Sequence, residues 1–313
     1  MTGLVTLGEA MLAVSLREAG PLFPGATARL SFAGAEATVA IGVCRQGHRA
    51  AWTGVVGADA AATMILTALR AEGVDTTHVR VDPSLPTGLM LRQRRTSDHI
   101  LACYYRKGQA GAGLRPEDID PDLIAGAGVL HVTGITPALG PGPLEAVRHA
   151  VAVARTAGTT VSLDVNYRSM LWSPAEATAV LRPLAQEADI VFAGLDEAGL
   201  LVETAGAAPT ARALAELGPR QCVIKLGADG ALALVDDEVF VQAAVPVTAV
   251  DPIGAGDSFV AGYLSGLLDG ADPAERLRTA AICGAFSVSV PGDWEGLPHR
   301  TESSLLTGDD IRR

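Results

Sequence analysis

Asp257 closes the stretch Gly254-Ala255-Gly256-Asp257, and these four residues could hold an anion beside a proton acceptor. Apolar side chains recur with a helical period after Asp257, so the glycine turn is expected to open a helix. The first backbone N–H groups of a helix lack internal partners, and the helix dipole is positive there. Glycines let phosphate oxygens approach such a backbone closely. The carboxylate of Asp257 could accept a proton from a substrate hydroxyl; the alternative is an aspartate that only stabilises the helix start.

The segments that must position this turn alternate between strand and helix. Short apolar runs predict strands, and the stretches between them predict helices. The expected strands are 4–7, 50–56, 129–133, 160–165, 190–192 and 222–226, followed by a hairpin of 232–235 and 239–242. The expected helices are 34–47, 60–72, 143–156, 174–186, 197–203, 209–217 and 259–268. This alternation predicts a mostly parallel sheet with helices on both faces.

Composition and charge exclude several classes of protein. The 313 residues are 49% hydrophobic and carry a formal net charge of −11, which supplies a large core and argues against a nucleic-acid partner. No apolar run is long enough to span a membrane, and the N-terminus lacks the pattern of a signal peptide. The four cysteines form no Cys-x-x-Cys pair, so a zinc site is not expected. A cytoplasmic protein fits best.

The chain lacks the two common nucleotide fingerprints. There is no Gly-x-x-x-x-Gly-Lys-Ser/Thr loop, and no Gly-x-Gly-x-x-Gly follows a strand. A nucleotide would have to be held in another way.

The stretch from Gly254 to Asp257 resembles the second signature of the PfkB, or ribokinase-like, carbohydrate kinases. Gly34, Gly47 and Gly57 match the spacing of the first signature. One departure is Thr38, which stands where the family usually has asparagine and so removes an amide from that position.

This resemblance implies a ribokinase-like three-layer α/β/α fold with a mostly parallel central sheet and a small β-lid, forming one domain over residues 1–313. It places the lid in residues 12–32 and 87–108, where the sequence shows no strong helical period. In the family the lid covers the sugar and often pairs with a second subunit. A homo-oligomer formed through the lid is therefore expected.

The resemblance also implies an ATP-dependent kinase that uses Mg²⁺. Asp257 would activate the sugar hydroxyl, and the N–H groups of Gly254, Ala255 and Gly256 would stabilise charge on the moving phosphoryl group. Phosphoryl transfer passes through a loose transition state, so positioning matters more than base strength. Asp257 is expected to stay ionised and weakly basic because it lies at a helix N-terminus.

The stretch from Lys225 to Gly230 resembles the family segment that lies over the nucleotide phosphates and ribose. The resemblance assigns Lys225, Gly227 and Gly230 to ATP, and it assigns Asn166 together with Lys225 to the orientation of phosphates. The alternative for the segment is a plain hairpin turn.

Glu197 matches the glutamate of a family motif for magnesium and phosphate placement, but Gly194 stands where the family has asparagine. Magnesium is expected to bind mainly ATP oxygens and waters, so any role of Glu197 would be indirect.

Five stretches resemble the 2-keto-3-deoxygluconate kinases within the family. They are residues 104–108, 134–139, 162–172, 251–253 and 292–296. The resemblance implies that Tyr104, Arg106 and Arg168 hold the carboxylate and keto group of a sugar acid. Gly34 and Asp293 would meet sugar hydroxyls.

An arginine fork binds a carboxylate at two points, which makes Arg106 and Arg168 chemically sensible partners for a sugar acid. Two arginines that face one empty site would repel each other, so their convergence would imply an anion. The alternative for each arginine is a surface charge or a structural ion pair. Met90 is a further departure, since it stands at a lid position where a relative carries tyrosine.

The sequence therefore favours a kinase that phosphorylates the 6-hydroxyl of 2-keto-3-deoxygluconate. One alternative is a PfkB kinase for a neutral sugar such as fructose, or for a related sugar acid. Another is a non-catalytic sugar or nucleotide sensor on the same fold, which would need neither Asp257 nor the glycine turn.

Overall fold

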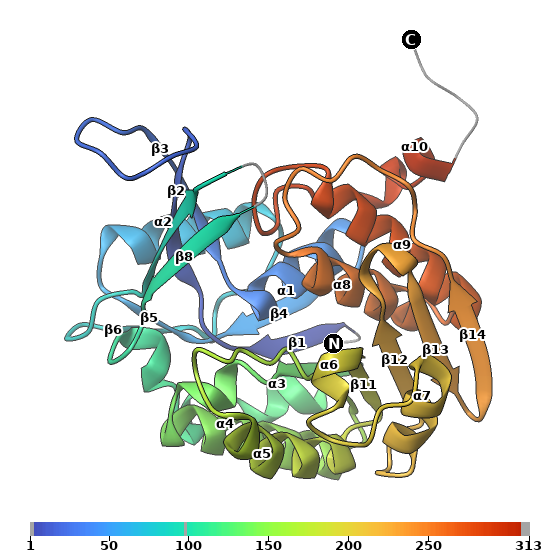
Figure 1. Ribbon diagram of the computed structural model, residues 1–313. Coiled ribbons are helices and arrows are strands. Elements are labelled where there is room, and N and C mark those ends of the chain that lie inside the picture. The colour runs from blue at the N-terminus through green and yellow to red at the C-terminus, as the bar shows by residue number, and fades with distance from the viewer. Residues whose placement is uncertain (1–2, 97–98, 308–313) are drawn as a thin grey trace.

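The computed structural model describes residues 3–96 and 99–307, and an eight-stranded sheet runs through its centre (Figure 1). In spatial order its strands are β14 (Glu238–Gln242), β13 (Ala231–Val235), β12 (Gln221–Lys225), β11 (Ile190–Gly194), β10 (Thr160–Asp164), β9 (Val129–Thr133), β1 (Leu4–Leu7) and β4 (Ala50–Thr53). Neighbours from β4 to β12 are parallel, whereas β12–β13 and β13–β14 are antiparallel. The carboxyl ends of the parallel strands therefore meet at one edge of the sheet.

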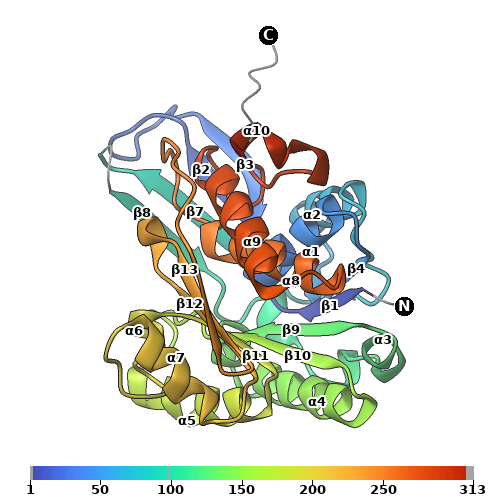
Figure 2. The same ribbon diagram turned by 90° about the vertical axis from the view of Figure 1, so that its right-hand side faces the viewer.

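Helices cover both faces of this sheet, as Figure 2 shows. One face carries α3 (Pro121–Ala125), α4 (Pro141–Ala157), α5 (Pro174–Glu187), α6 (Leu195–Ala198) and α7 (Ala207–Ala215). The other carries α1 (Ala35–Arg45), α2 (Ala60–Ala71), α8 (Ala255–Leu268) and α9 (Pro273–Val288). A last short helix, α10, spans Ser304–Thr307. Short 3₁₀ turns lie at Ala110–Gly113, Pro116–Asp118, Thr136–Leu139, Gly227–Asp229 and Arg300–Glu302.

Two hydrophobic cores follow from the alternation of side chains along each strand. In β11, Val191 and Ala193 pack in the core beneath α4, α5 and α7, whereas Ile190 and Phe192 pack in the core beneath α1, α8 and α9. The Phe192 ring meets the edge of Tyr263 from α8, with ring centroids 5.2 Å apart. Because both faces of the strands are buried, β11 reads as a continuous apolar run.

A second sheet of four strands stands beside the central sheet, at the upper left of Figure 1, and we call it the lid sheet. Its strand order is β3 (Ala28–Ala33), β2 (Met11–Leu16), β7 (Leu89–Arg94) and β8 (Ile100–Tyr105). The polar turn between β7 and β8 includes residues 97–98, which lie outside the described residues. A two-stranded sheet pairs β5 (Val55–Gly57) with β6 (Arg80–Asp82).

The expected fold class is confirmed, with several local differences. The single strand expected over 50–56 is two strands, because Gly54 packs against the carbonyl oxygen of Gly8 and the ring of Trp52, and the chain leaves the central sheet there. The helix expected over 197–203 ends at Ala198. Helix α9 was not predicted, since many of its buried residues are alanines or other small residues that give no clear apolar stripe.

In the part of the chain that the structure describes, no helix combines the length and the apolar composition needed to cross a bilayer.

Candidate active site

Polar residues gather where the parallel strands end. Glu9 follows β1, Thr133 ends β9, Asn166 follows β10 and Lys225 ends β12. The N-terminus of α8 approaches the same edge, since it brings Asp257 within hydrogen-bonding distance of Asn166. In open α/β sheets the crevice beyond the carboxyl ends of the strands is where ligands bind.

Helix α8 begins at Ala255, and Gly254 precedes it with a φ of 77°. A Cβ at Gly254 would collide with the backbone carbonyl of Asp293, so both the conformation and the close packing require glycine. Gly256 is different, because its nearest neighbour would be the Nζ atom of Lys225 at 3.7 Å. Nothing in the fold itself crowds a Cβ at Gly256, so only an approaching ligand could make that position restrictive.

Asp257 lies in the first turn of α8, where the Nδ2 atom of Asn166 donates a hydrogen bond to its Oδ1 atom at 3.0 Å. Asn166 is buried and has a φ of 38°, a left-handed conformation that asparagine tolerates better than most residues. The sequence assigned Asn166 to phosphate orientation. In the structure its amide faces the carboxylate that is the expected base.

Burial raises the pKa of Asp257 to about 7, and the nearby carboxylate of Asp164 adds to this effect. The cations of Arg168 and Lys225 oppose the rise, and Glu36 adds to it. With a pKa of about 7 the carboxyl group is only partly ionised at neutral pH, and it is more basic than its place at a helix N-terminus led us to expect. The partial charge at a helix end is about half an elementary charge, which is too little to offset burial beside two other carboxylates.

Lys225 points its Nζ atom at both carboxylate oxygens of Asp164, at 2.8 Å each. Burial acts to lower the pKa of Lys225, but the carboxylates of Asp164, Glu197 and Asp257 outweigh it and raise that pKa. The ammonium group is thus held charged beside the glycine turn. Sequence reasoning missed Asp164, although a carboxylate that ends a buried apolar strand was a usable signal.

Glu197 uses both carboxylate oxygens on backbone donors. It accepts from the N–H of Gly194 at 2.7 Å and from the N–H of Tyr167 at 3.0 Å, so it joins the start of α6 to the segment after β10. Among residues 3–96 and 99–307, no three His, Cys, Asp or Glu side chains are grouped so that they could hold a metal ion.

The two glycines assigned to ATP differ in what fixes them. Gly230 has a φ of 97°, and a Cβ there would collide with the carbonyl oxygen of Gln242, so the hairpin itself requires glycine. Gly227 has a φ of 58°, and a Cβ there would meet no atom within 4 Å. Only Gly227 leaves open space that a ligand could fill.

Arg106 forms an ion pair with Glu9, with 2.5 Å between its Nη2 atom and Oε2, and it lies over the ring of Tyr104. Burial raises the pKa of Glu9 even though Arg106 acts to lower it. Arg106 therefore already has an internal counter-ion, and the argument that its charge requires a bound anion does not hold. Gly34, which precedes α1, packs against the backbone oxygen of Glu9.

Arg168 is exposed, and its charge lowers the pKa of both Asp257 and Asp293. Its guanidinium therefore lies near enough to act on the expected base and on an expected hydroxyl acceptor. Burial still raises the pKa of Asp293 to about 6, because Glu295 and Asp251 oppose the effect of nearby cations.

Two buried residues near the site were not predicted. Glu36, in the first turn of α1, accepts from the hydroxyls of Thr133 and Thr136 at 2.7 Å each, and burial raises its pKa. Its Oε2 atom has no hydrogen-bond partner among the described residues. Arg92 from β7 binds Asp251 and Asp293. In both cases the sequence signal was a charged residue in an apolar segment.

Met90 and Thr38, two of the departures from the family pattern, are buried packing residues.

Comparisons with known proteins show what this chain is similar to. The sequence profile described as "pfkB family carbohydrate kinase" matches residues 1–300. A 2-dehydro-3-deoxygluconokinase of Bacillus subtilis (strain 168) is 38% identical over 300 residues, which cover 95% of this chain and 92% of that protein. One from Thermoproteus tenax is 36% identical over 311 residues, covering 98% and 94%. The crystal structure of the 2-dehydro-3-deoxygluconokinase of Thermotoga maritima superposes with a TM-score of 0.90 at 25% identity, covering 98% of this chain and 100% of that one.

Proposed function

This chain belongs to the PfkB family of carbohydrate kinases, and from that premise we propose that it transfers a phosphoryl group from ATP to the 6-hydroxyl of 2-keto-3-deoxygluconate. The observation that carries the choice of a sugar acid is the position of Arg168. Its exposed guanidinium acts on both Asp257 and Asp293, so a carboxylate could bind it while the sugar hydroxyls reach the two aspartates. A neutral sugar would leave that cation without a partner.

Asp257 accepts the proton of the attacking hydroxyl, and Asn166 holds its carboxylate in one orientation. The backbone N–H groups of Gly254, Ala255 and Gly256 stabilise negative charge on the transferring group. Lys225 contributes a fixed positive charge next to Gly256. Because the transition state is loose, these positioned charges contribute more than base strength.

The site fits a nucleotide whose phosphates reach Lys225 and the start of α8, with Gly227 leaving room for it. Mg²⁺ would neutralise charge on the phosphates and would be held mainly by phosphate oxygens and by water. No grouping of three acidic, histidine or cysteine side chains in the described residues competes with that arrangement. Glu197 supports the site through the backbone rather than through a free carboxylate.

We also propose that two copies of the chain pair through the outer face of the lid sheet. Ala13, Ser15 and Arg92 line a pocket on its inner face, so the alternate residues point the other way. Those outer residues include Leu30, Leu101 and Tyr105, whose exposed fractions are 60%, 52% and 58%. An apolar sheet face of this kind fits a second copy of itself.

We place the enzyme in the cytoplasm, where ATP is abundant. All four cysteines are free, as expected in a reducing compartment.

A coupled assay of ADP release over a panel of sugars and sugar acids tests the proposed reaction. The value of kcat/KM for 2-keto-3-deoxygluconate should exceed that for fructose. If fructose is the better substrate, the sugar-acid assignment is wrong and the neutral-sugar alternative holds. If no sugar in the panel releases ADP while ATP still binds, the chain acts as a sensor.

A further inference from the structure

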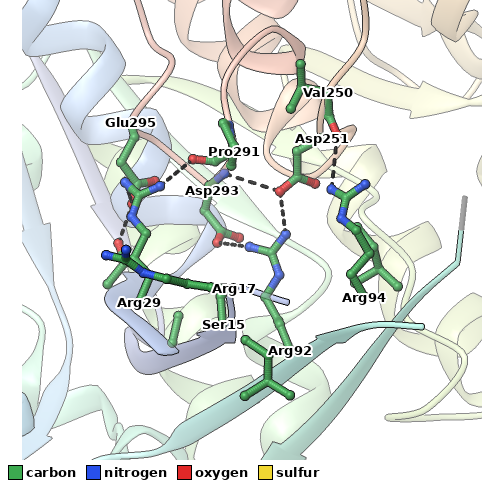
Figure 3. Close-up of a pocket in the computed structure, with 15 residues that line it drawn as sticks. Ser15, Arg17, Arg29, Arg92, Arg94, Val250, Asp251, Pro291, Asp293 and Glu295 are labelled. Carbon is green, nitrogen blue, oxygen red and sulfur yellow. Dashed lines mark hydrogen bonds and ion pairs between the residues drawn. The ribbon is translucent and has the colours of Figure 1, made fainter. Parts of the chain in front are cut away.

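Arg92, in lid strand β7, is one of the most deeply buried arginines in the described part of the chain, with 5% of its surface exposed. Figure 3 shows that its guanidinium contacts two carboxylates, and both of these belong to segments outside the lid sheet. The Nη2 atom lies 2.7 Å from Oδ2 of Asp251, and the Nη1 atom lies 3.0 Å from Oδ2 of Asp293. One lid side chain thus contacts residues 159 and 201 positions away in the sequence.

Both carboxylates belong to segments that shape the start of α8. Asp251 also accepts from the N–H groups of Ile253 and Gly292, at 3.2 Å each, so it joins the turn before α8 to the loop that carries Asp293. The backbone of Asp293 packs directly against Gly254. Any shift of Asp251 or Asp293 would therefore move the glycine turn whose N–H groups are expected to bind the phosphoryl group.

Without Arg92, the carboxylates near Asp293 would outnumber the cations that act on it. The groups that act on its carboxylate are Arg92 from the lid, Arg168 from the segment after β10, Asp251, and Glu295 from its own loop. Burial and the two other carboxylates raise the pKa of Asp293 to about 6, and Arg92 is the stronger of the two cations that oppose them. Protonation turns one carboxylate oxygen into an O–H donor, so the ionised form is the better acceptor of hydrogen bonds from sugar hydroxyls.

We propose that Arg92 is a positioning residue for phosphoryl transfer, which fixes the orientation of the Asp293 carboxylate and the turn that leads into α8. It acts from the lid and touches neither the phosphoryl group nor the base. The inference rests on the proposed function only in that Asp293 is taken to meet a sugar hydroxyl. It holds for any sugar that has such a hydroxyl.

A nearby ion pair provides a matched control. Arg29 of β3 also reaches from the lid to the loop at 291–295, where it binds Glu295 at 2.9 Å and the carbonyl oxygen of Pro291 at 2.9 Å (Figure 3). Arg29 therefore contacts neither of the two aspartates that Arg92 binds. Arg29→Gln thus removes a more exposed ion pair between the lid and the body of the protein and leaves both contacts of Arg92 in place, although Glu295 also acts on Asp293.

The experiment compares Arg92→Gln with Arg29→Gln, on the sugar that the wild-type enzyme phosphorylates best. In Arg92→Gln we expect the KM for the sugar to rise about ten- to hundredfold, the usual effect of losing a hydrogen bond to a charged group. The acidic limb of kcat/KM against pH should also move to higher pH, because Asp293 would hold its proton more tightly. Arg29→Gln should change both quantities much less, because Arg92 and its two carboxylate contacts remain. Equal effects of the two variants would mean that Arg92 only tethers the lid.

Removing Arg92 leaves two buried carboxylates without their cation, so Arg92→Gln could fail to fold. Two further variants keep the test decisive. Arg92→Lys retains the charge but not the fork, so it should keep the wild-type acidic limb while still raising the KM for the sugar. The double variant Arg92→Gln/Asp251→Asn removes one of the two unpaired carboxylates and should fold. Its KM for the sugar should stay raised, whereas its acidic limb should shift less than in Arg92→Gln, because Asp251 itself raises the pKa of Asp293. A wild-type KM in that double variant would overturn the proposal.

Discussion

The Nδ2 atom of Asn166 donates to the Oδ1 atom of Asp257 across 91 residues of sequence, and it does so from a left-handed backbone conformation with a φ of 38°. Asn166 lies just beyond the carboxyl end of β10, and Asp257 lies in the first turn of α8. The left-handed backbone of Asn166 directs its buried side-chain amide towards the Asp257 carboxylate. Asn166 orients the Asp257 carboxylate, whereas burial and nearby charges set its pKa. The orientation and the pKa can therefore be tested by different substitutions.

Asn166→Gly should lower kcat while the protein still folds, because glycine accepts the left-handed conformation and only the amide is lost. A hydrogen bond to a charged group contributes about 1.5–3 kcal/mol, so a loss of roughly ten- to a hundredfold is expected. Steady-state kinetics with saturating ATP measure it. An unchanged kcat would mean that Asp257 keeps its orientation without Asn166.

Asp257→Asn should reduce turnover by about 10²–10⁴-fold, the usual contribution of a positioned acid or base. ATP affinity should change little, because the backbone N–H groups at the start of α8 remain. Direct titration of ATP by calorimetry provides the control. Turnover close to that of the wild type would remove Asp257 from the mechanism.

The raised pKa of Asp257 has consequences for both activity and stability. The base must be ionised to accept a proton, so kcat/KM should fall as the pH decreases through about 7. For stability the sign is opposite. A carboxyl group whose pKa rises on folding, here from 3.8 to about 7, stabilises the fold below its unfolded pKa, and that contribution is lost as the pH rises through about 7.

Asp257→Asn removes this ionisation, so the variant should melt at a higher temperature than the wild type at about pH 8. The difference should shrink towards about pH 3, where the wild-type carboxyl group is largely protonated in both states. Thermal unfolding at the two pH values measures it. A variant that is less stable than the wild type at the higher pH would show that the carboxylate is stabilising and the direction of the shift is wrong.

Gly256→Ala and Gly254→Ala should fail in different ways. The methyl group added in Gly256→Ala would meet only Lys225 Nζ at 3.7 Å, so the fold should survive while turnover falls through contact with the nucleotide phosphates. Gly254→Ala forces a side chain into a left-handed conformation, at about 1–2 kcal/mol, and against the carbonyl of Asp293. Its melting temperature should decrease. Equal stability with full activity for Gly256→Ala would mean that the turn does not contact phosphate.

Arg168→Ala should raise the KM for 2-keto-3-deoxygluconate about ten- to a hundredfold and leave the KM for ATP unchanged. The same substitution should affect fructose much less, because fructose has no carboxylate for the guanidinium to bind. The ratio of kcat/KM for the two sugars in wild type and variant is the measurement. If both sugars lose activity equally, Arg168 supports the site without selecting the acid.

Leu30→Asp combined with Leu101→Asp should separate the proposed dimer, because it places two charges on the outer face of the lid sheet. Light scattering coupled to size-exclusion chromatography measures the mass. Val241→Asp is the control, since Val241 is 72% exposed but lies on β14, at the far edge of the central sheet. A wild-type protein that is monomeric at micromolar concentration would contradict the proposed pairing.

The sequence alone was sufficient for the alternation of strands and helices that builds the central sheet and for the glycine turn before α8, but not for helix α9. Apolar strands that alternate with helices predict a parallel sheet with helices on both faces, because both faces of each strand must be buried. The turn was predictable because its chemistry is local. Gly254 sets the backbone conformation, and the unpaired N–H groups belong to the residues that follow it directly.

Only the tertiary structure determined which charges neutralise one another. Lys225 binds Asp164, Arg106 binds Glu9, and Arg92 binds two aspartates, and each pair joins segments that are far apart in the sequence. Those pairings depend on strand order and on how the lid sheet meets the central sheet. The pKa of Asp257 depends on burial and on Asp164, and neither is encoded in the four residues of its motif. A local pattern can therefore place a carboxylate, but the surrounding fold decides its protonation state.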